Sequence, residues 1–142
     1  MVKVNRTLYD DYFDYQNQYS QKYGDKSIVL MQIGGFYEAY QSPIGGYNLD
    51  KLSDMLNIQV TLKNKKKDYD KSNPRMMGFP IASIFKYVRI LINLGFTVIV
   101  FDQRDIGLKK MERFVSGIYS SGTYLDIDDD RNPNSRYLLS IF

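Results

Sequence analysis

The chain is built around one segment, Leu30-Met31-Gln32-Ile33-Gly34-Gly35-Phe36-Tyr37-Glu38-Ala39-Tyr40. The two glycines predict a two-residue hairpin turn, because glycine tolerates the positive φ that such turns need. Side chains alternate along the strand that follows, so Phe36, Glu38 and Tyr40 share one face, while Tyr37 and Ala39 share the other. A large apolar ring and a carboxylate are therefore expected to project side by side from a stiff corner.

Composition restricts the class of protein. The 142 residues are 44% hydrophobic, which is enough for one domain with its own core. Cysteine and histidine are absent, so there are no disulfides and no thiol chemistry, and the usual zinc and copper ligands and the commonest general base are missing. No apolar run could span a bilayer and no signal peptide opens the chain. We therefore expect a soluble, intracellular protein with no membrane contact.

Charge and aromatic content are compatible with a nucleic-acid partner. The net charge of +3 is mild. The 13 tyrosines and 8 phenylalanines offer planar rings for stacking, although most such rings fill half-buried positions in a folded domain.

Hydrophobic periodicity predicts the elements of the fold. Helices are predicted at residues 7–23, 49–56 and 81–94. Strands are predicted at 28–33, 36–40, 58–62, 96–101 and 109–119, with a short extended piece at 75–80 and a loop at 102–105. The fold class is α+β, a mixed β-sheet with about three helices packed on it. We expect one domain over residues 1–130, followed at 131–142 by a linker and the first strand of a second domain.

A lysine-rich loop, Lys63-Asn64-Lys65-Lys66-Lys67-Asp68-Tyr69-Asp70-Lys71-Ser72-Asn73-Pro74, allows two interpretations. It could be a solvated loop. It could also be a flap that contacts phosphates, because clustered lysines give sequence-independent affinity for a polyanion.

The spacing of Asp126, Asp128 and Asp130 is that of a calcium-binding loop. However, Arg131 stands where such a loop needs glycine and Tyr137 where it needs glutamate. No phosphate-binding loop of the G-x-x-x-x-G-K-[ST] type occurs in the chain. The sequence therefore predicts no metal site and no nucleoside triphosphate site of that type.

Five motifs in order resemble landmarks of the MutS DNA mismatch-repair family. The segment around the turn is similar to the family's G-D-F-Y-E motif. Asn57-Ile58-Gln59-Val60-Thr61 resembles the family's D-I-x-L-T motif, and Met76-Met77-Gly78-Phe79-Pro80 resembles P-M-x-G-[IV]-P. Val100-Phe101-Asp102-Gln103 is similar to I-C-E-Q, and Ser120-Ser121-Gly122-Thr123 is similar to T-P-G-T. The last strand, Tyr137-Leu138-Leu139-Ser140-Ile141, resembles the start of that family's connector domain. The resemblance covers residues 7–142, and it identifies residues 1–130 as a member of the family's N-terminal, mismatch-recognition domain, followed at 131–142 by the linker and the first strand of the connector domain.

The chain departs from the family pattern in three places. Gly35 replaces an aspartate, the loop Gln41–Asn48 is longer, and Ile81-Ala82-Ser83 stands where a histidine is usual. With the lysine-, asparagine-, isoleucine- and tyrosine-rich composition, these traits resemble a divergent branch found in large DNA viruses and octocoral mitochondria.

The resemblance implies roles for individual residues. Phe36 would be a wedge that stacks on a base in the minor groove, and Glu38 would contact a base edge. Hairpin and support residues would be Ile33, Gly34 and Gly35, while Met77, Gly78 and Pro80 would be structural. DNA-backbone contacts would come from Lys63, Arg113, Lys65, Lys66 and Lys67.

The resemblance also implies partners and cofactors. Double-stranded DNA, especially mismatched DNA, would be the ligand, and the protein would form a homodimer through downstream domains. The family's ATPase lies outside this chain, so the chain is expected to be non-catalytic and to need no cofactor, with ATP and Mg²⁺ bound elsewhere in the full-length protein.

Two alternatives remain open. One is a nucleic-acid-backbone binding module that does not read mismatches, against which the presence of both Phe36 and Glu38 argues. The other is a carboxylate enzyme that pairs Glu38 with Asp102 or Asp105.

Overall fold

The computed structural model describes residues 6–121 and the backbone of residues 124–125. The helices are α1 (Leu8–Tyr23), α2 (Leu49–Leu56) and α3 (Ile84–Asn93), with a 3₁₀ turn η1 (Ile81–Ser83) before α3. The strands are β1 (Ser27–Ile33), β2 (Phe36–Gln41), β3 (Thr61–Leu62), β4 (Arg75–Pro80), β5 (Thr97–Gly107), β6 (Lys110–Tyr119) and β7 (Tyr124–Leu125). The acidic segment 126–134 and the strand predicted at 137–142 lie outside the described residues, as does part of the turn Ser120-Ser121-Gly122-Thr123.

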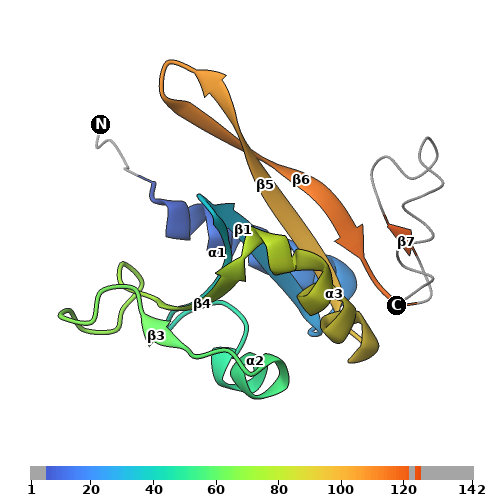
Figure 1. Ribbon diagram of the computed structural model, residues 1–142. Coiled ribbons are helices and arrows are strands. Elements are labelled where there is room, and N and C mark those ends of the chain that lie inside the picture. Colours follow the sequence, from blue (N-terminus) through green and yellow to red (C-terminus); the bar gives the residue numbers. More distant parts are fainter. Residues whose placement is uncertain (1–5, 122–123, 126–142) are drawn as a thin grey trace.

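The strands form one mixed sheet in the order β3-β4-β2-β1-β5-β6-β7, which confirms the α+β class (Figure 1). Strand β1 pairs antiparallel with β2 and parallel with β5. The remaining pairs in the sheet are antiparallel. Because β1 and β5 are parallel, their C-terminal ends lie at the same end of the sheet, where the β1–β2 turn also lies.

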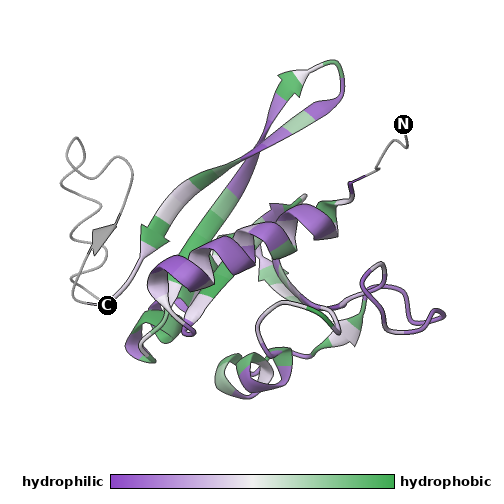
Figure 2. Ribbon diagram, turned by 180° about the vertical axis from the view of Figure 1, so that it is seen from behind, coloured by the Kyte–Doolittle hydropathy of each residue, from purple (hydrophilic) through white to green (hydrophobic). Residues whose placement is uncertain are grey.

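Helix α1 covers one face of the sheet, while α2 and α3 cover the other (Figures 1 and 2). The Tyr12 hydroxyl donates to the carbonyl of Val29 (2.8 Å), and the Gln16 amide donates to the carbonyl of Ser27 (2.8 Å), so polar groups fix α1 on β1. On the opposite face, Leu52 of α2 and Leu91 of α3 are buried. The sheet therefore lies between two helical layers, and each of its faces is covered by at least one helix.

Strands β5 and β6 extend beyond the body of the sheet as an arm, residues 102–116 (Figure 1). Because Met31 of β1 is paired with Phe101, the end of β1 at Ile33 is level with Gln103. From there β5 continues to Gly107, which at 3.3 Å per residue is about 13 Å past the end of β1. The arm thus projects in the same direction as the turn that carries Phe36.

The arm overturns the predicted loop at residues 102–105. This segment is strand, paired with β6 and supported by an ion pair between Arg104 and Glu112 (3.1 Å). The hydrophobic pattern disappears there because β5 extends beyond the core at Asp102, and its residues from Arg104 to Gly107 are exposed to solvent. The polar side chains at residues 102–105 therefore give the sequence pattern of a loop, although β5 continues through them.

Two smaller predictions also need correction. The strand expected at residues 58–62 pairs with β4 only at Thr61 and Leu62, while Ile58 and Val60 pack on the core without belonging to a strand. The helix expected at residues 81–94 begins with the 3₁₀ turn η1 before α3. In the part of the chain described above, no helix is long and apolar enough to cross a membrane.

Candidate nucleic-acid interface

The β1–β2 turn is tight and well held. Ile33 is paired with Phe36, so the loop contains only two residues, and Gly34 takes the positive φ of +58° that the prediction required. The Gln32 amide donates to the carbonyl of Gly34 (3.1 Å). The carbonyl of Gly35 accepts the backbone N–H of Ile81 (3.0 Å). Backbone and amide hydrogen bonds thus hold the corner in which glycine replaces the family's aspartate.

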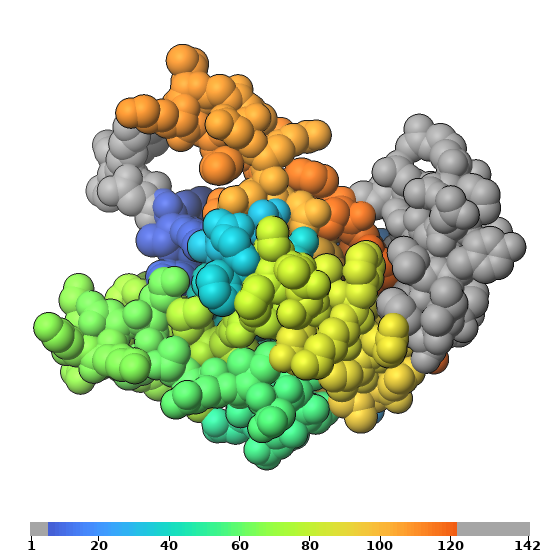
Figure 3. All heavy atoms as spheres, viewed as in Figure 1, coloured from blue at the N-terminus to red at the C-terminus, as the bar shows by residue number. Residues whose placement is uncertain are grey.

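Phe36 stands at the exposed end of β2, with 48% of its surface accessible. It lines a hollow of about 300 Å³ together with Glu38, Gln59, Thr61, Met76, Met77 and Gly78. An exposed phenylalanine at a rigid corner is unusual, because burying such a ring normally stabilises a protein by about 1.5–3 kcal/mol. In the space-filling view the hairpin reaches the surface between the arm and the lysine-rich loop (Figure 3).

Glu38 shares the face of Phe36, as the alternation predicted, but its side chain is only 9% exposed. It accepts a hydrogen bond from the hydroxyl of Tyr40. The ammonium of Lys63 lies 3.6 Å from the same oxygen, Oε1. The structure therefore places Lys63, predicted to contact phosphate, in an ion pair with the carboxylate of the hairpin.

Tyr40 is a functional candidate that the sequence analysis missed. Its ring is fully buried against α1 and meets the rings of Tyr9 and Tyr12 edge-on, at 5.1 Å in each case. Burial, followed by the hydrogen bond to Glu38, raises the pKa of the Tyr40 phenol. The hydroxyl therefore keeps its proton and acts as the donor. Strand alternation had already put both residues on one face, which is the signal that could have revealed the pair.

Gly78 on β4 leaves room for Glu38, which is paired with it across the strands. A Cβ atom at this position would lie 2.8 Å from the carbonyl oxygen of Tyr37 and 3.1 Å from Cγ of Glu38. The close approach of β4 to β2 thus requires glycine here, in agreement with the predicted structural role.

The lysine-rich loop is organised by one buried side chain. The Asn73 amide donates to the carbonyls of Asn64, Lys67 and Asp68, at 2.9–3.0 Å. This leaves the side chains of Lys65, Lys66 and Lys67 exposed. The loop therefore has a defined backbone and displays its cations to solvent.

Arg113 lies on the arm, where β6 pairs it with Gln103 of β5. Gln103 is itself next to the turn, because its N–H donates to the side chain of Gln32 (3.0 Å). The buried Nε of Arg113 has no hydrogen-bond partner among the described residues. Two further exposed cations near the arm's end, Lys109 and Lys110, were not singled out from the sequence.

The two carboxylates proposed for an enzyme do not meet Glu38. Asp102 accepts a hydrogen bond from the Tyr37 hydroxyl (2.6 Å), and Tyr37 faces away from Glu38 on β2. Asp105 accepts the backbone N–H of Gly107 farther along the arm (2.8 Å). Within residues 6–121, no group of three or more acidic side chains is placed to hold a metal ion.

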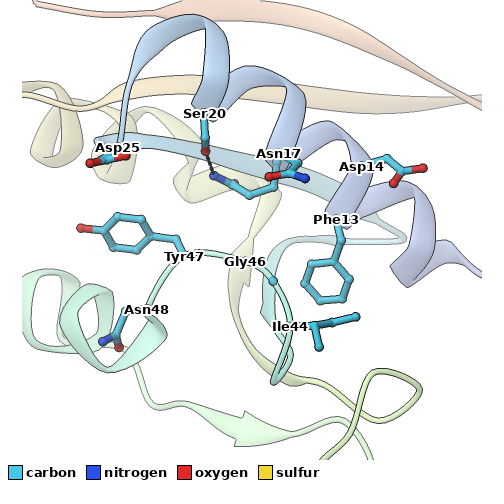
Figure 4. A pocket seen from close by; sticks show the side chains of 11 residues that line it. Phe13, Asp14, Asn17, Ser20, Asp25, Ile44, Gly46, Tyr47 and Asn48 are labelled. Atoms are coloured by element: carbon cyan, nitrogen blue, oxygen red, sulfur yellow. Dashed lines mark hydrogen bonds between the residues drawn. The ribbon is translucent and has the colours of Figure 1, made fainter.

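A pocket of about 530 Å³ lies between α1 and the loop 43–48 (Figure 4). Phe13, Asn17 and Ser20 contribute from the helix, with Ile44 and Tyr47 across from them. This pocket is at the far end of β2 from Phe36, so it does not belong to the hairpin surface.

Comparison with known proteins assigns the chain to a family. Residues 12–128 match the model of MutS domain I. The chain is 40% identical over 139 residues to the putative DNA mismatch repair protein mutS homolog L359 of Acanthamoeba polyphaga mimivirus, covering 96% of this chain and 12% of that protein. It is 29% identical over 153 residues to the mitochondrial DNA mismatch repair protein mutS homolog of Sarcophyton glaucum, covering 92% of this chain and 15% of that protein.

A further relative is the DNA mismatch repair protein MutS of Methanococcoides burtonii, with 24% identity over 144 residues, 99% of this chain and 15% of that protein. The chain thus spans 12–15% of the length of these three relatives. A viral and a mitochondrial protein are among them, as the divergent motifs suggested. With the family model matched over most of its length, the chain belongs to the MutS family as a domain I.

Proposed function

We propose that this chain is the DNA-binding domain of a mismatch-repair protein, and that its β1–β2 hairpin senses mispaired or easily deformed DNA. The observation that carries the proposal is the exposure of Phe36 at a corner fixed by the turn and by the hydrogen bond from Ile81. Membership of the MutS family supports a DNA partner.

Phe36 would act as a wedge in the minor groove. A ring that stacks on a base gains about 1–3 kcal/mol whatever the base, whereas opening a base step costs a few kcal/mol. The cost is lowest at a mismatch, so ease of opening becomes the signal. A rigid corner is needed because a flexible one would fold the ring back onto the protein instead.

Glu38 would contact the edge of the opened base. Its carboxylate lines the hollow beside Phe36, so a base drawn toward the ring would come within its reach. On intact duplex the same charge would be repelled by phosphates, which penalises binding to paired DNA. The ion pair with Lys63 reduces this penalty without removing it.

Backbone contacts would come from the lysine-rich loop and the arm. Lys65, Lys66 and Lys67 are exposed on one side of the hairpin, and Arg113 lies on the arm that projects in the same direction as the turn. We include Lys63 as a cation that could reach a phosphate from its place beside Glu38. These contacts would give affinity without sequence preference.

The rest of the activity is expected from other parts of the full-length protein. We propose that ATP and Mg²⁺ bind there, that this domain is non-catalytic, and that homodimerisation also depends on those parts.

The experiment compares the affinity of the full-length protein for a mismatched and a fully paired duplex of the same sequence. Phe36→Ala is expected to abolish the preference for the mismatch. The matched control is Ile44→Ala, another exposed apolar side chain, which lies at the opposite end of β2 and should keep the preference. An unchanged preference in Phe36→Ala would refute the wedge.

A further inference from the structure

The end of the arm, residues 106–111, displays apolar side chains to solvent, and we call it the arm tip. Leu108 is 92% exposed, the highest value among the large apolar side chains of the described residues, and Ile106 and Met111 are also exposed. Figure 2 shows hydrophobic residues at this end of the arm, where it stands apart from the helices. Apolar side chains gathered at an exposed place are typical of a surface that meets a partner.

The turn at the arm tip is made by two residues that are unfavourable in it. Gly107 pairs with Lys110, so Leu108 and Lys109 form a two-residue hairpin loop. Both take the left-handed backbone conformation, with φ of +54° and +59°. Such turns favour asparagine, aspartate or glycine, because most other side chains are strained at positive φ. Neither backbone geometry nor burial within this domain accounts for leucine at position 108.

Positive charge lies next to these apolar side chains. Lys109 and Lys110 are both exposed at the turn. The acidic side chains nearby are already engaged, because Asp105 accepts a backbone N–H of the turn (2.8 Å) and Glu112 is paired with Arg104 (3.1 Å). The arm tip thus combines an apolar side chain with two cations, which suits a polyanion that also exposes apolar atoms, as a DNA duplex does in its grooves.

The arm tip and the hairpin corner are close enough to contact the same turn of a duplex. Strand β1 lies between β2 and β5, so Phe36 and Gly107 are about 10 Å apart across the strands and about 13 Å apart along them. Their separation is therefore about 16 Å, against about 34 Å for one helical turn of DNA. Since the arm projects in the same direction as the turn that carries Phe36, a duplex placed on Phe36 passes within reach of the arm tip.

We propose that the arm tip is a second DNA contact, in which Leu108 packs against the duplex while Lys109 and Lys110 contact nearby phosphates. Leucine is one of the apolar side chains that DNA-bending proteins place in the minor groove. This inference rests on the proposed function, since it needs a duplex on the β1–β2 hairpin. Leu108 lies away from the mismatch, so its contact strengthens binding to paired and mispaired DNA by the same factor.

The test measures the stability of the full-length protein and its affinity for a paired and a mismatched duplex. Leu108→Asn removes the apolar side chain and supplies a residue that positive φ favours, so the urea midpoint should be unchanged or higher. Affinity should nevertheless fall about fivefold for both duplexes. The slope of log affinity against log salt concentration should not change, because no charge is lost. A loss of affinity without a loss of stability excludes damage to the turn as its cause.

Three sets of variants serve as controls. Leu108→Met keeps an apolar side chain of similar size and should retain the affinity of the original protein. Ile44→Asn removes another apolar side chain, 80% exposed, at the opposite end of β2 from Phe36, and should leave the affinity unchanged. Lys109→Met and Lys110→Met each remove one charge, so each should lower the salt slope by about one.

The outcomes distinguish this inference from the proposed function. If Leu108→Asn binds both duplexes as tightly as the original protein, the arm contact is refuted, even where Phe36→Ala abolishes the preference for the mismatch. If Leu108→Asn keeps its DNA affinity but changes the oligomeric state, or weakens binding to vesicles that contain phosphatidylserine, the arm tip has another partner and the inference is overturned. If Phe36→Ala keeps the preference while Leu108→Asn loses affinity, the wedge is refuted and the arm contact stands.

Discussion

The hydroxyl of Tyr40 donates a hydrogen bond to Oε1 of Glu38, two residues earlier on the same face of β2. This contact joins the hairpin to the tyrosine face of α1, because the Tyr40 ring is packed between β2 and that helix. The carboxylate beside Phe36 is consequently fixed by the core rather than free at the surface. Hairpin, helix and strand β4 act together in placing it.

Gly78→Ala should destabilise the domain. The new methyl group would lie 2.8 Å from the carbonyl oxygen of Tyr37, and both partners of the clash are held in the sheet. Overpacking of this kind costs about 1–3 kcal/mol, measurable as a lower urea midpoint. Gly35→Ala is the control, because a Cβ there meets nothing within 4 Å. Equal stability of the two variants would contradict the close approach of β4 to Glu38.

Asn73→Ala should loosen the lysine-rich loop. The three carbonyls that accept from the Asn73 amide would lose their partner, and about 1 kcal/mol is expected per lost hydrogen bond. Trypsin, which cleaves after lysine, should then cut within residues 63–71 faster than in the original chain. Asn17→Ala, at an exposed position on α1, should leave the cleavage rate unchanged. No acceleration in Asn73→Ala would mean that the loop is held in another way.

Arg113→Met should reduce the salt dependence of DNA binding. Each phosphate contact contributes about one to the slope of log affinity against log salt concentration, so the slope should fall by about one. Lys26→Met is the control, because its ammonium donates to the carbonyl of Leu94 at the end of the sheet remote from the turn (2.9 Å). An identical slope for Arg113→Met and the original protein would remove Arg113 from the interface.

Stability should fall at alkaline pH in a way that depends on Tyr12. Burial raises the pKa of its phenol in the folded state above the ordinary value of 10. The unfolded chain therefore loses this proton first, and stability declines as the pH rises above 10. Tyr12→Phe should be less stable by about 1 kcal/mol at pH 7, where the hydrogen bond to Val29 is lost. The difference in free energy of unfolding between the original protein and Tyr12→Phe, measured by urea titration, should become smaller above pH 10. A difference that stays constant with pH would contradict the raised pKa of Tyr12.

The sequence predicted most of the elements, and its failures have physical causes. The predicted bounds of α2 and the two-residue turn are confirmed, and both depend on local signals. The Asn48 side chain accepts the backbone N–H groups of Asp50 and Lys51 at the start of α2, and the Gly-Gly pair forms the turn. The arm was missed because residues 102–105 belong to the part of β5 that extends beyond the buried residues of that strand. The contacts of Glu38 were missed because they depend on tertiary packing. Lys63 directly follows β3, which pairing with β4 brings near the hairpin, and α1 buries Tyr40.

The wedge role of Phe36 is tested most directly by 2-aminopurine fluorescence, with the fluorescent base placed beside a mismatch. This base brightens when it is unstacked, so saturating full-length protein should increase its emission, while Phe36→Ala at saturation should leave the emission close to that of free DNA. An equal increase with both proteins, or no increase with the original protein, would contradict insertion of Phe36 into the base stack.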